Sequence, residues 1–111
     1  MILKVKGGLM EIKTKKNNGN LIVSIGGELD ECSAVNAKSI LDKIIMDNSS
    51  TKKVIFDLKD LSFMDSTGIG LLIGRYKKLQ SLYIPSYISN AGVAVEKVIE
   101  LAGLYRIMPK Y

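Results

Sequence analysis

The sequence predicts a single α/β domain built on a mixed, mainly parallel sheet of about four to five strands, with helices chiefly on one side. Two strand-like segments near the start flank an Asn-Gly turn, so the sheet is expected to begin with an antiparallel hairpin. Helical and strand patterns then alternate three times, and right-handed crossovers would place those later strands parallel. With 111 residues, 47% of them hydrophobic, the chain can bury one core.

Residues 1–9, MILKVKGGL, are expected to be a non-native or disordered leader, and the domain is expected to occupy residues 10–111. The triplet Lys6-Gly7-Gly8 is what a purine-rich ribosome-binding sequence gives when it is translated in frame. Met10 is therefore an alternative native start, and on that interpretation the leader is dispensable.

The hairpin is expected to pair residues 10–15, which alternate apolar and polar, with the apolar run at residues 21–25. Asn17-Asn18-Gly19 supplies the turn, because Asn and Gly tolerate positive φ. Gly26-Gly27 is expected to end the second strand before a turn at Glu28-Leu29-Asp30.

A first helix follows, with Ser33 as its expected cap and one apolar stripe along its length. The stripe consists of Ala37, Ile40, Leu41, Ile44 and Ile45. The next strand, residues 54–58, is apolar enough for a central place in a parallel sheet. Asp57 interrupts it, and we expect this carboxylate to accept hydrogen bonds from neighbouring loops.

A loop carrying Asp65 and Ser66 then leads into a second helix, in which apolar residues recur at helical spacing. These residues are Ile69, Leu72, Ile73, Tyr76 and Leu79. Asp65 or Ser66 is expected to cap the helix, or Thr67 if the boundary shifts. The first N–H groups of a helix lack partners within it and favour negative charge. The serine is thus part of an ordinary helix cap or an exposed phosphorylation site, and the residues alone leave both open.

The last third is expected to contain a short or edge strand near residues 87–90, because Pro85 cannot donate within a ladder. A third helix, with Val95, Val98, Ile99 and Ala102 on one face, should stop at Gly103. Residues 104–108 are then expected to add a final strand.

The segment from Leu61 to Gly70, LSFMDSTGIG, continued by Gly74-Arg75-Tyr76-Lys77, resembles the signature of the anti-sigma factor antagonists, the STAS-domain family. The chain is most similar to the sporulation members of that family. Further matches are Gly27-Glu28-Leu29-Asp30 and Gly103-Leu104, and the resemblance extends from Met10 to Met108.

This resemblance implies a regulatory cycle. The unphosphorylated protein would bind an anti-sigma factor that is also a serine kinase, and so release a sporulation sigma factor. Phosphorylation on Ser66 would abolish binding, and a serine phosphatase would reset the protein. The residues implied in partner binding are Glu28, Asp30, Asp65, Thr67, Gly68, Ile69 and Gly70.

Simpler roles remain open for several of these residues. Glu28 and Asp30 are docking acids or solvated loop acids, Ile69 is a contact or a core residue, and Gly68 and Gly70 would permit close approach. Arg75, within the matched motif, is equally well a solvated helix residue. Thr67 is an alternative phosphoacceptor.

Intrinsic catalysis, cofactors and metals are not expected in this chain; the resemblance assigns ATP and metals to the partners. The absence of histidine excludes Ser-His-Asp and Cys-His sites, and the single cysteine, Cys32, excludes a disulfide within the chain and suits a reducing cytoplasm. No apolar run approaches about eighteen residues, so membrane insertion is not expected. The net charge of +5 comes from scattered basic residues, which does not favour direct nucleic-acid binding.

Two alternatives remain. The loop from Asp65 to Gly70 could cradle the phosphates of a nucleotide, although it lacks the lysine of a P-loop. The protein could also regulate the general stress response rather than sporulation.

Overall fold

A six-stranded mixed sheet forms the centre of the computed structural model, which describes residues 2–5 and 10–111. The strands are β1 (Ile2–Val5), β2 (Met10–Asn17), β3 (Asn20–Leu29), β4 (Lys53–Asp57), β5 (Leu61–Met64) and β6 (Ser86–Ser89). The helices are α1 (Glu31–Asp47), α2 (Ser66–Ser81), α3 (Val93–Ala102) and a short 3-10 helix, η1 (Leu104–Arg106). The strand order is β1-β2-β3-β4-β6, with β5 paired to β3.

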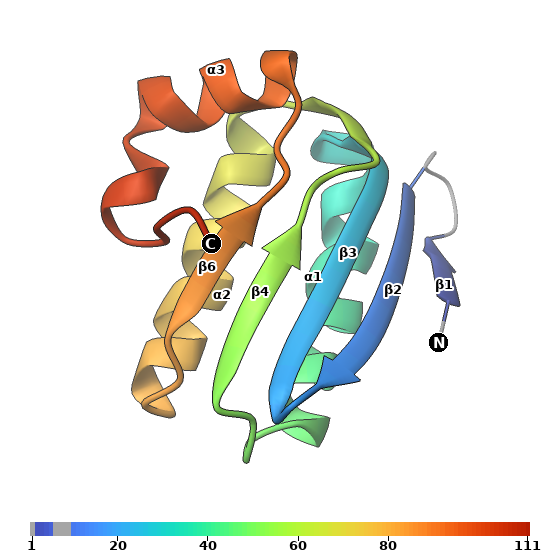
Figure 1. Cartoon of the computed structure of the whole chain (residues 1–111). Coiled ribbons are helices and arrows are strands. Elements are labelled where there is room, and N and C mark those ends of the chain that lie inside the picture. The colour runs from blue at the N-terminus through green and yellow to red at the C-terminus, as the bar shows by residue number, and fades with distance from the viewer. Residues whose placement is uncertain (1, 6–9) are drawn as a thin grey trace.

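The predicted fold class, an α/β domain with a mixed, mainly parallel sheet that starts with an antiparallel hairpin, is confirmed, and the sheet has six strands where about four to five were predicted. Pairing is antiparallel between β1, β2 and β3 and parallel for β3–β4, β3–β5 and β4–β6. Helices α1 and α2 cover one face of the sheet, while α3 lies across its end (Figure 1). The expected turn joins β2 to β3, with φ of 54° at Asn18 and 84° at Gly19.

Strand β1 falls within the expected leader and pairs with β2, from Ile2 opposite Lys13 to Val5 opposite Met10. Residues 1 and 6–9 lie outside the described residues. The leader and the alternative start at Met10 stay predictions.

The expected end of the second strand at Gly26-Gly27 is wrong. Strand β3 continues to Leu29 by pairing with β5, across an irregularity between Gly27 and Glu28. At this irregularity Gly27 adopts a φ of 90°, which favours glycine, and its N–H donates to the Asp60 carbonyl at 2.9 Å. Strand β5 was not predicted, since four residues with only the first and last buried show no strand periodicity.

The core lies between the sheet and the helices. Its largest fully buried side chains include Phe56, Ile12, Leu21, Leu41, Leu72 and Ile99. The predicted stripe of α1 is confirmed, with Ile40 partly buried and the other four residues buried. The structural role of Asp57 is also confirmed: its Oδ1 accepts from Lys59 N at 3.1 Å and Asn90 Nδ2 at 3.2 Å.

The C-terminal segment differs from the prediction. Gly103 ends α3 in the left-handed conformation, as expected, but residues 104–108 form η1 and a turn rather than a strand. Leu104 and Met108 are buried, which holds this turn against the core. Pairing resumes only afterwards, where Tyr111 N donates to the Ile88 carbonyl at 2.8 Å. Strand β6 is short, as predicted, and begins at Ser86.

An ionic cluster fixes this tail to α3. Glu96 Oε1 accepts a hydrogen bond from Tyr105 Oη at 2.8 Å and lies 2.7 Å from Lys110 Nζ. The hydrogen bond from Lys110 is the main reason that the pKa of Glu96 is lowered, followed by that from Tyr105.

Replacing Glu96 with Gln should therefore remove a pH-dependent part of the stability. A carboxylate whose pKa is lowered by folding stabilises the protein above its ordinary pKa, 4.5, and loses that contribution as pH falls through the lower folded value. Thermal unfolding from neutral pH to about pH 3 should show the wild type and Glu96→Gln converging in acid. Glu100→Gln is the control, and a difference unchanged across the range would contradict the prediction.

Candidate functional site

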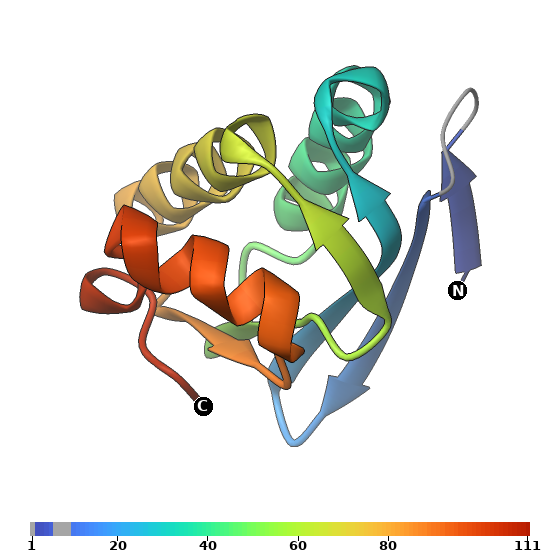
Figure 2. The same ribbon diagram turned by 90° about the horizontal axis from the view of Figure 1, so that it is seen from above.

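The candidate site lies where β3 and β5 end side by side and two helices begin. Leu29 is the parallel partner of Met64, and Asp65 N donates to the Leu29 carbonyl at 3.4 Å. Asp30 and Asp65 follow directly as the N-caps of α1 and α2. Figure 2 shows each strand leading into its helix, with the two helices on the same side of the sheet. The pairing of β3 with β5 thus brings Gly27-Glu28-Leu29-Asp30 together with the segment from Leu61 to Gly70.

Asp65 caps α2, which was one of the predicted options. Its Oδ1 accepts hydrogen bonds from Thr67 N at 2.9 Å and Gly68 N at 3.2 Å. Ser66 is the first residue of the helix, is exposed, and makes no side-chain hydrogen bond with any described residue. Because the aspartate does the capping, the serine hydroxyl remains available for chemistry.

Asp30 caps α1, so the expectation that Ser33 is the cap is wrong. Asp30 Oδ1 accepts from Cys32 N at 2.9 Å and Ser33 N at 3.0 Å. The buried Ser33 hydroxyl completes a capping box by accepting from Asp30 N at 3.1 Å, and it donates to the Glu28 carbonyl at 2.9 Å. Glu28 is a half-buried strand residue rather than part of a turn.

Both capping aspartates keep one carboxylate oxygen free. In each, only Oδ1 accepts hydrogen bonds from the described residues, and Oδ2 accepts none. A basic side chain of another protein can therefore approach Oδ2 of Asp30 or Asp65 without breaking either cap.

The four remaining predicted contact residues differ in exposure. Thr67 and Gly70 are exposed, whereas Gly68 and Ile69 are buried. Ile69 is therefore a core residue, as its helical spacing indicated, rather than an exposed contact. A Cβ atom on Gly68 would lie 2.5 Å from Met64 Cγ and 2.9 Å from the Leu29 carbonyl, so this glycine allows α2 to pack against β3 and β5. Both glycines were expected to let a partner approach the backbone closely. Only Gly70 leaves room for this, because a Cβ atom there would have no neighbour within 4 Å.

Alanine substitutions should separate these two glycines. Gly68→Ala is expected to lower the free energy of unfolding by about 1–3 kcal/mol through overpacking. Gly70→Ala should raise the free energy of unfolding by about 0.5–1 kcal/mol, because alanine has the higher helix propensity and its Cβ would have no neighbour within 4 Å. Urea denaturation measures both. Equal effects of the two substitutions would show that the packing contact at Gly68 does not matter.

Two exposed apolar residues extend the site and were missed from the sequence. Phe63 of β5 is 48% exposed and Val35 of α1 is 74% exposed. Val35 also lines a groove of about 400 Å³ between α1 and α2, together with Lys38, Thr67 and Gly70. The only sequence signal for Val35 was an apolar residue outside the helix stripe.

Arg75 is a buried ion-pair residue and not a solvated one, which corrects that interpretation. It is 6% exposed, and its Nε lies 3.0 Å from Asp42 Oδ1 of α1. The contact is an ion pair without hydrogen-bond alignment, and Lys78 Nζ approaches the same oxygen at 3.3 Å. Arg75 therefore ties α2 to α1 behind the site.

The described residues contain no group of three or more His, Cys, Asp or Glu side chains placed to hold a metal ion. Ser66 and Lys78 are separated by most of α2, about 18 Å along the axis, which is too far for these two side chains to act as a pair. Within the same residues, none of the helices has the length and apolar character needed to cross a membrane.

Residues 11–111 match the family model of the STAS domain. The chain is 30% identical over 102 residues to an anti-sigma F factor antagonist of Paenibacillus polymyxa, covering 92% of this chain and 86% of the relative. It is 29% identical over 99 residues to an anti-sigma-B factor antagonist of Staphylococcus aureus, covering 89% and 90%. The structure of the anti-sigma factor antagonist SpoIIAA in its unphosphorylated form superposes with a TM-score of 0.74 at 25% identity, covering 90% and 87%. The motif-based resemblance is confirmed, and the chain belongs to the STAS-domain family.

Proposed function

We propose that this protein is an anti-sigma factor antagonist that switches partners through phosphorylation of Ser66. The unphosphorylated form binds an anti-sigma factor that is also a serine kinase, releasing a sporulation sigma factor. The kinase phosphorylates Ser66 and the complex dissociates, after which a serine phosphatase restores the hydroxyl. The observation that carries the proposal is the exposed, uncommitted Ser66 hydroxyl directly after the capping Asp65, in a chain whose relatives are named anti-sigma factor antagonists.

The arrangement of charges supports this role over nucleotide binding. The N–H groups of Thr67 and Gly68, which would cradle a phosphate, already donate to Asp65. The carboxylate of Asp65 would also repel a free phosphate. A partner protein can instead place cations on the free aspartate oxygens and apolar side chains on Phe63 and Val35.

Intact-mass analysis after incubation with the cognate anti-sigma kinase and ATP tests the proposal. The wild type and Thr67→Ala should each gain one phosphoryl group, and Ser66→Ala should gain none. Loss of the modification in Thr67→Ala alone would assign the phosphate to Thr67. If the wild type gains no phosphoryl group while the kinase phosphorylates another substrate, the proposed phosphorylation switch is contradicted.

The pathway follows from the identity of the partner. Relatives of comparable similarity are antagonists of anti-sigma F and of anti-sigma-B factors, so a general-stress role is the second candidate. Titration of the protein against a sporulation and a general-stress anti-sigma factor separates the two. If the protein acts in sporulation, its complex with the sporulation anti-sigma factor should be the tighter of the two.

Neutralising the acidic caps should weaken the complex without unfolding the domain. Asp30→Asn keeps a good N-cap but removes the charge, and we expect a loss of about tenfold in affinity. Glu28→Gln tests the neighbouring acid in the same way. Glu31→Gln is the control, since Glu31 is an exposed acid in the first turn of α1. Calorimetric titration at two salt concentrations measures the effect, and an Asp30→Asn affinity equal to that of the control would remove the docking role.

A further inference from the structure

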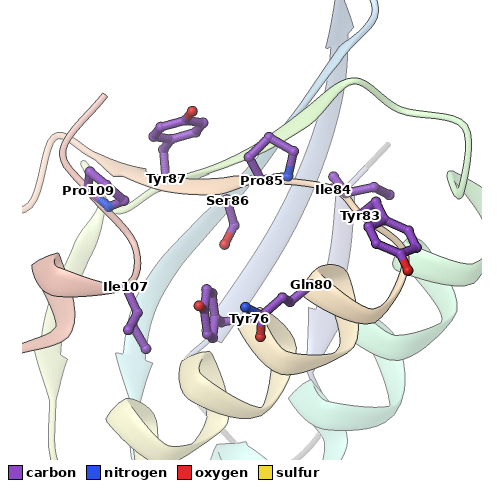
Figure 3. Close-up of a pocket in the computed structure, with 9 residues that line it drawn as sticks. All are labelled: Tyr76, Gln80, Tyr83, Ile84, Pro85, Ser86, Tyr87, Ile107 and Pro109. Atoms are coloured by element: carbon purple, nitrogen blue, oxygen red, sulfur yellow. The ribbon is translucent and has the colours of Figure 1, made fainter.

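A second cavity lies at the opposite end of α2 from Ser66. It has a volume of about 470 Å³ and opens between the C-terminal half of α2, the edge strand β6 and the segment after η1 (Figure 3). Gln80 lines it and is about 21 Å along the helix axis from Ser66. Its volume is within the range of small-molecule sites, about 300–1,000 Å³. The cavity is therefore separate from the proposed partner site.

The floor of the cavity contains a polar group without a partner. Ser86 is 4% exposed, and its Oγ makes no hydrogen bond with any described residue. Figure 3 shows this hydroxyl pointing into the cavity, toward Tyr76 and Gln80 of α2. Buried hydroxyls normally have a partner, because an unsatisfied one costs free energy. The serine is thus suited to a hydrogen bond with a bound molecule.

The other polar groups of the cavity define the ligand. The side chains of Tyr76 and Gln80 each offer a donor and an acceptor, and neither forms a hydrogen bond with the described residues. No Lys, Arg, Asp or Glu lines the cavity, so no lining residue could pair with a charged group of a ligand. The walls are apolar and are formed by Ile84, Ile107 and Pro109, together with the Tyr76 ring.

We propose that this cavity binds an uncharged, planar heteroaromatic molecule whose edge carries both a donor and an acceptor. The edge reaches Ser86 Oγ and the Gln80 amide, while the flat faces pack against the tyrosine ring and the apolar walls. Flat rings lose little conformational freedom on binding, which suits a shallow cavity with few polar groups.

Methyl NMR with three small probes tests the proposal. The probe 7-azaindole has adjacent donor and acceptor nitrogens, indole has the donor only, and benzoate is charged. We expect 7-azaindole to shift the methyl signals of Ile84 and Ile107 in a saturable manner, with a dissociation constant of about 1 mM. Indole should bind more weakly, and benzoate should leave these signals unchanged. Benzoate binding as tight as that of 7-azaindole would overturn the neutral ligand class.

Three variants make the test specific. Ser86→Ala removes only the unpartnered hydroxyl and should lower the affinity for 7-azaindole about tenfold. Gln80→Ala changes an exposed residue, so the fold is kept, and should also weaken binding. The control is Ser89→Ala, on the same strand but outside the cavity lining. No saturable shift in the wild type, or equal affinity in Ser86→Ala and Ser89→Ala, would overturn the site.

Discussion

Phosphorylated protein is expected to bind the anti-sigma partner at least about a hundredfold more weakly than unphosphorylated protein. The modification adds about −1.5 to −2 charges at neutral pH, at the start of α2, where Asp65 is the cap and the Asp30 cap of α1 lies on the neighbouring strand end. In a docked complex this charge loses its water and crowds the interface. Calorimetric titration of both forms against the partner measures the change.

The same modification should leave the fold intact. Ser66 is exposed and forms no side-chain hydrogen bond with the described residues, so the phosphate displaces nothing in the core. The α2 macrodipole also favours negative charge at this end, by about 0.3–1 kcal/mol. The free energy of unfolding should therefore change by less than about 1 kcal/mol. A large shift in the unfolding transition, or unchanged partner affinity, would contradict a switch that acts through the surface.

Asp42→Ala is expected to lower the free energy of unfolding by about 3 kcal/mol. It removes the carboxylate that faces Arg75 Nε at 3.0 Å and leaves the guanidinium buried without a counter-charge. A loss of this size corresponds to a decrease in Tm of roughly 10–20 °C for a domain of this length. Thermal unfolding followed by circular dichroism measures it.

Two further variants establish the cause. Lys43→Ala removes an exposed ion pair between Lys43 and Asp47 in the same helix, and should change stability by less than about 1 kcal/mol. The double variant Asp42→Leu/Arg75→Met replaces the buried pair with apolar groups and should recover most of the lost stability. If the double variant is as unstable as Asp42→Ala, the unpaired charge is not the cause.

The sequence alone determined features that depend on neighbouring residues. The Asn18-Gly19 turn, the stripes of α1 and α2 and the Gly103 stop each follow from backbone preference or periodicity within a few residues. The predicted stripe of α3 is confirmed at Val95, Val98 and Ile99, whereas Ala102 is exposed. The motif around Ser66 also identified the family, because its residues are contiguous. The cap of α2 was predicted only as one of Asp65, Ser66 and Thr67, and the structure assigns it to Asp65.

The tertiary structure decided what depends on partners distant in the chain. Strand β5 exists because β3 is beside it, and that pairing brings Asp30 next to Asp65. Arg75 is buried where Asp42 of α1 faces it, and Gly68 is required by the close packing of Met64 and Leu29. Ser86 faces a cavity that three separate segments enclose. Hydrophobic periodicity reports which face of an element is apolar and carries no information about which distant residue meets it, so these features required the folded chain.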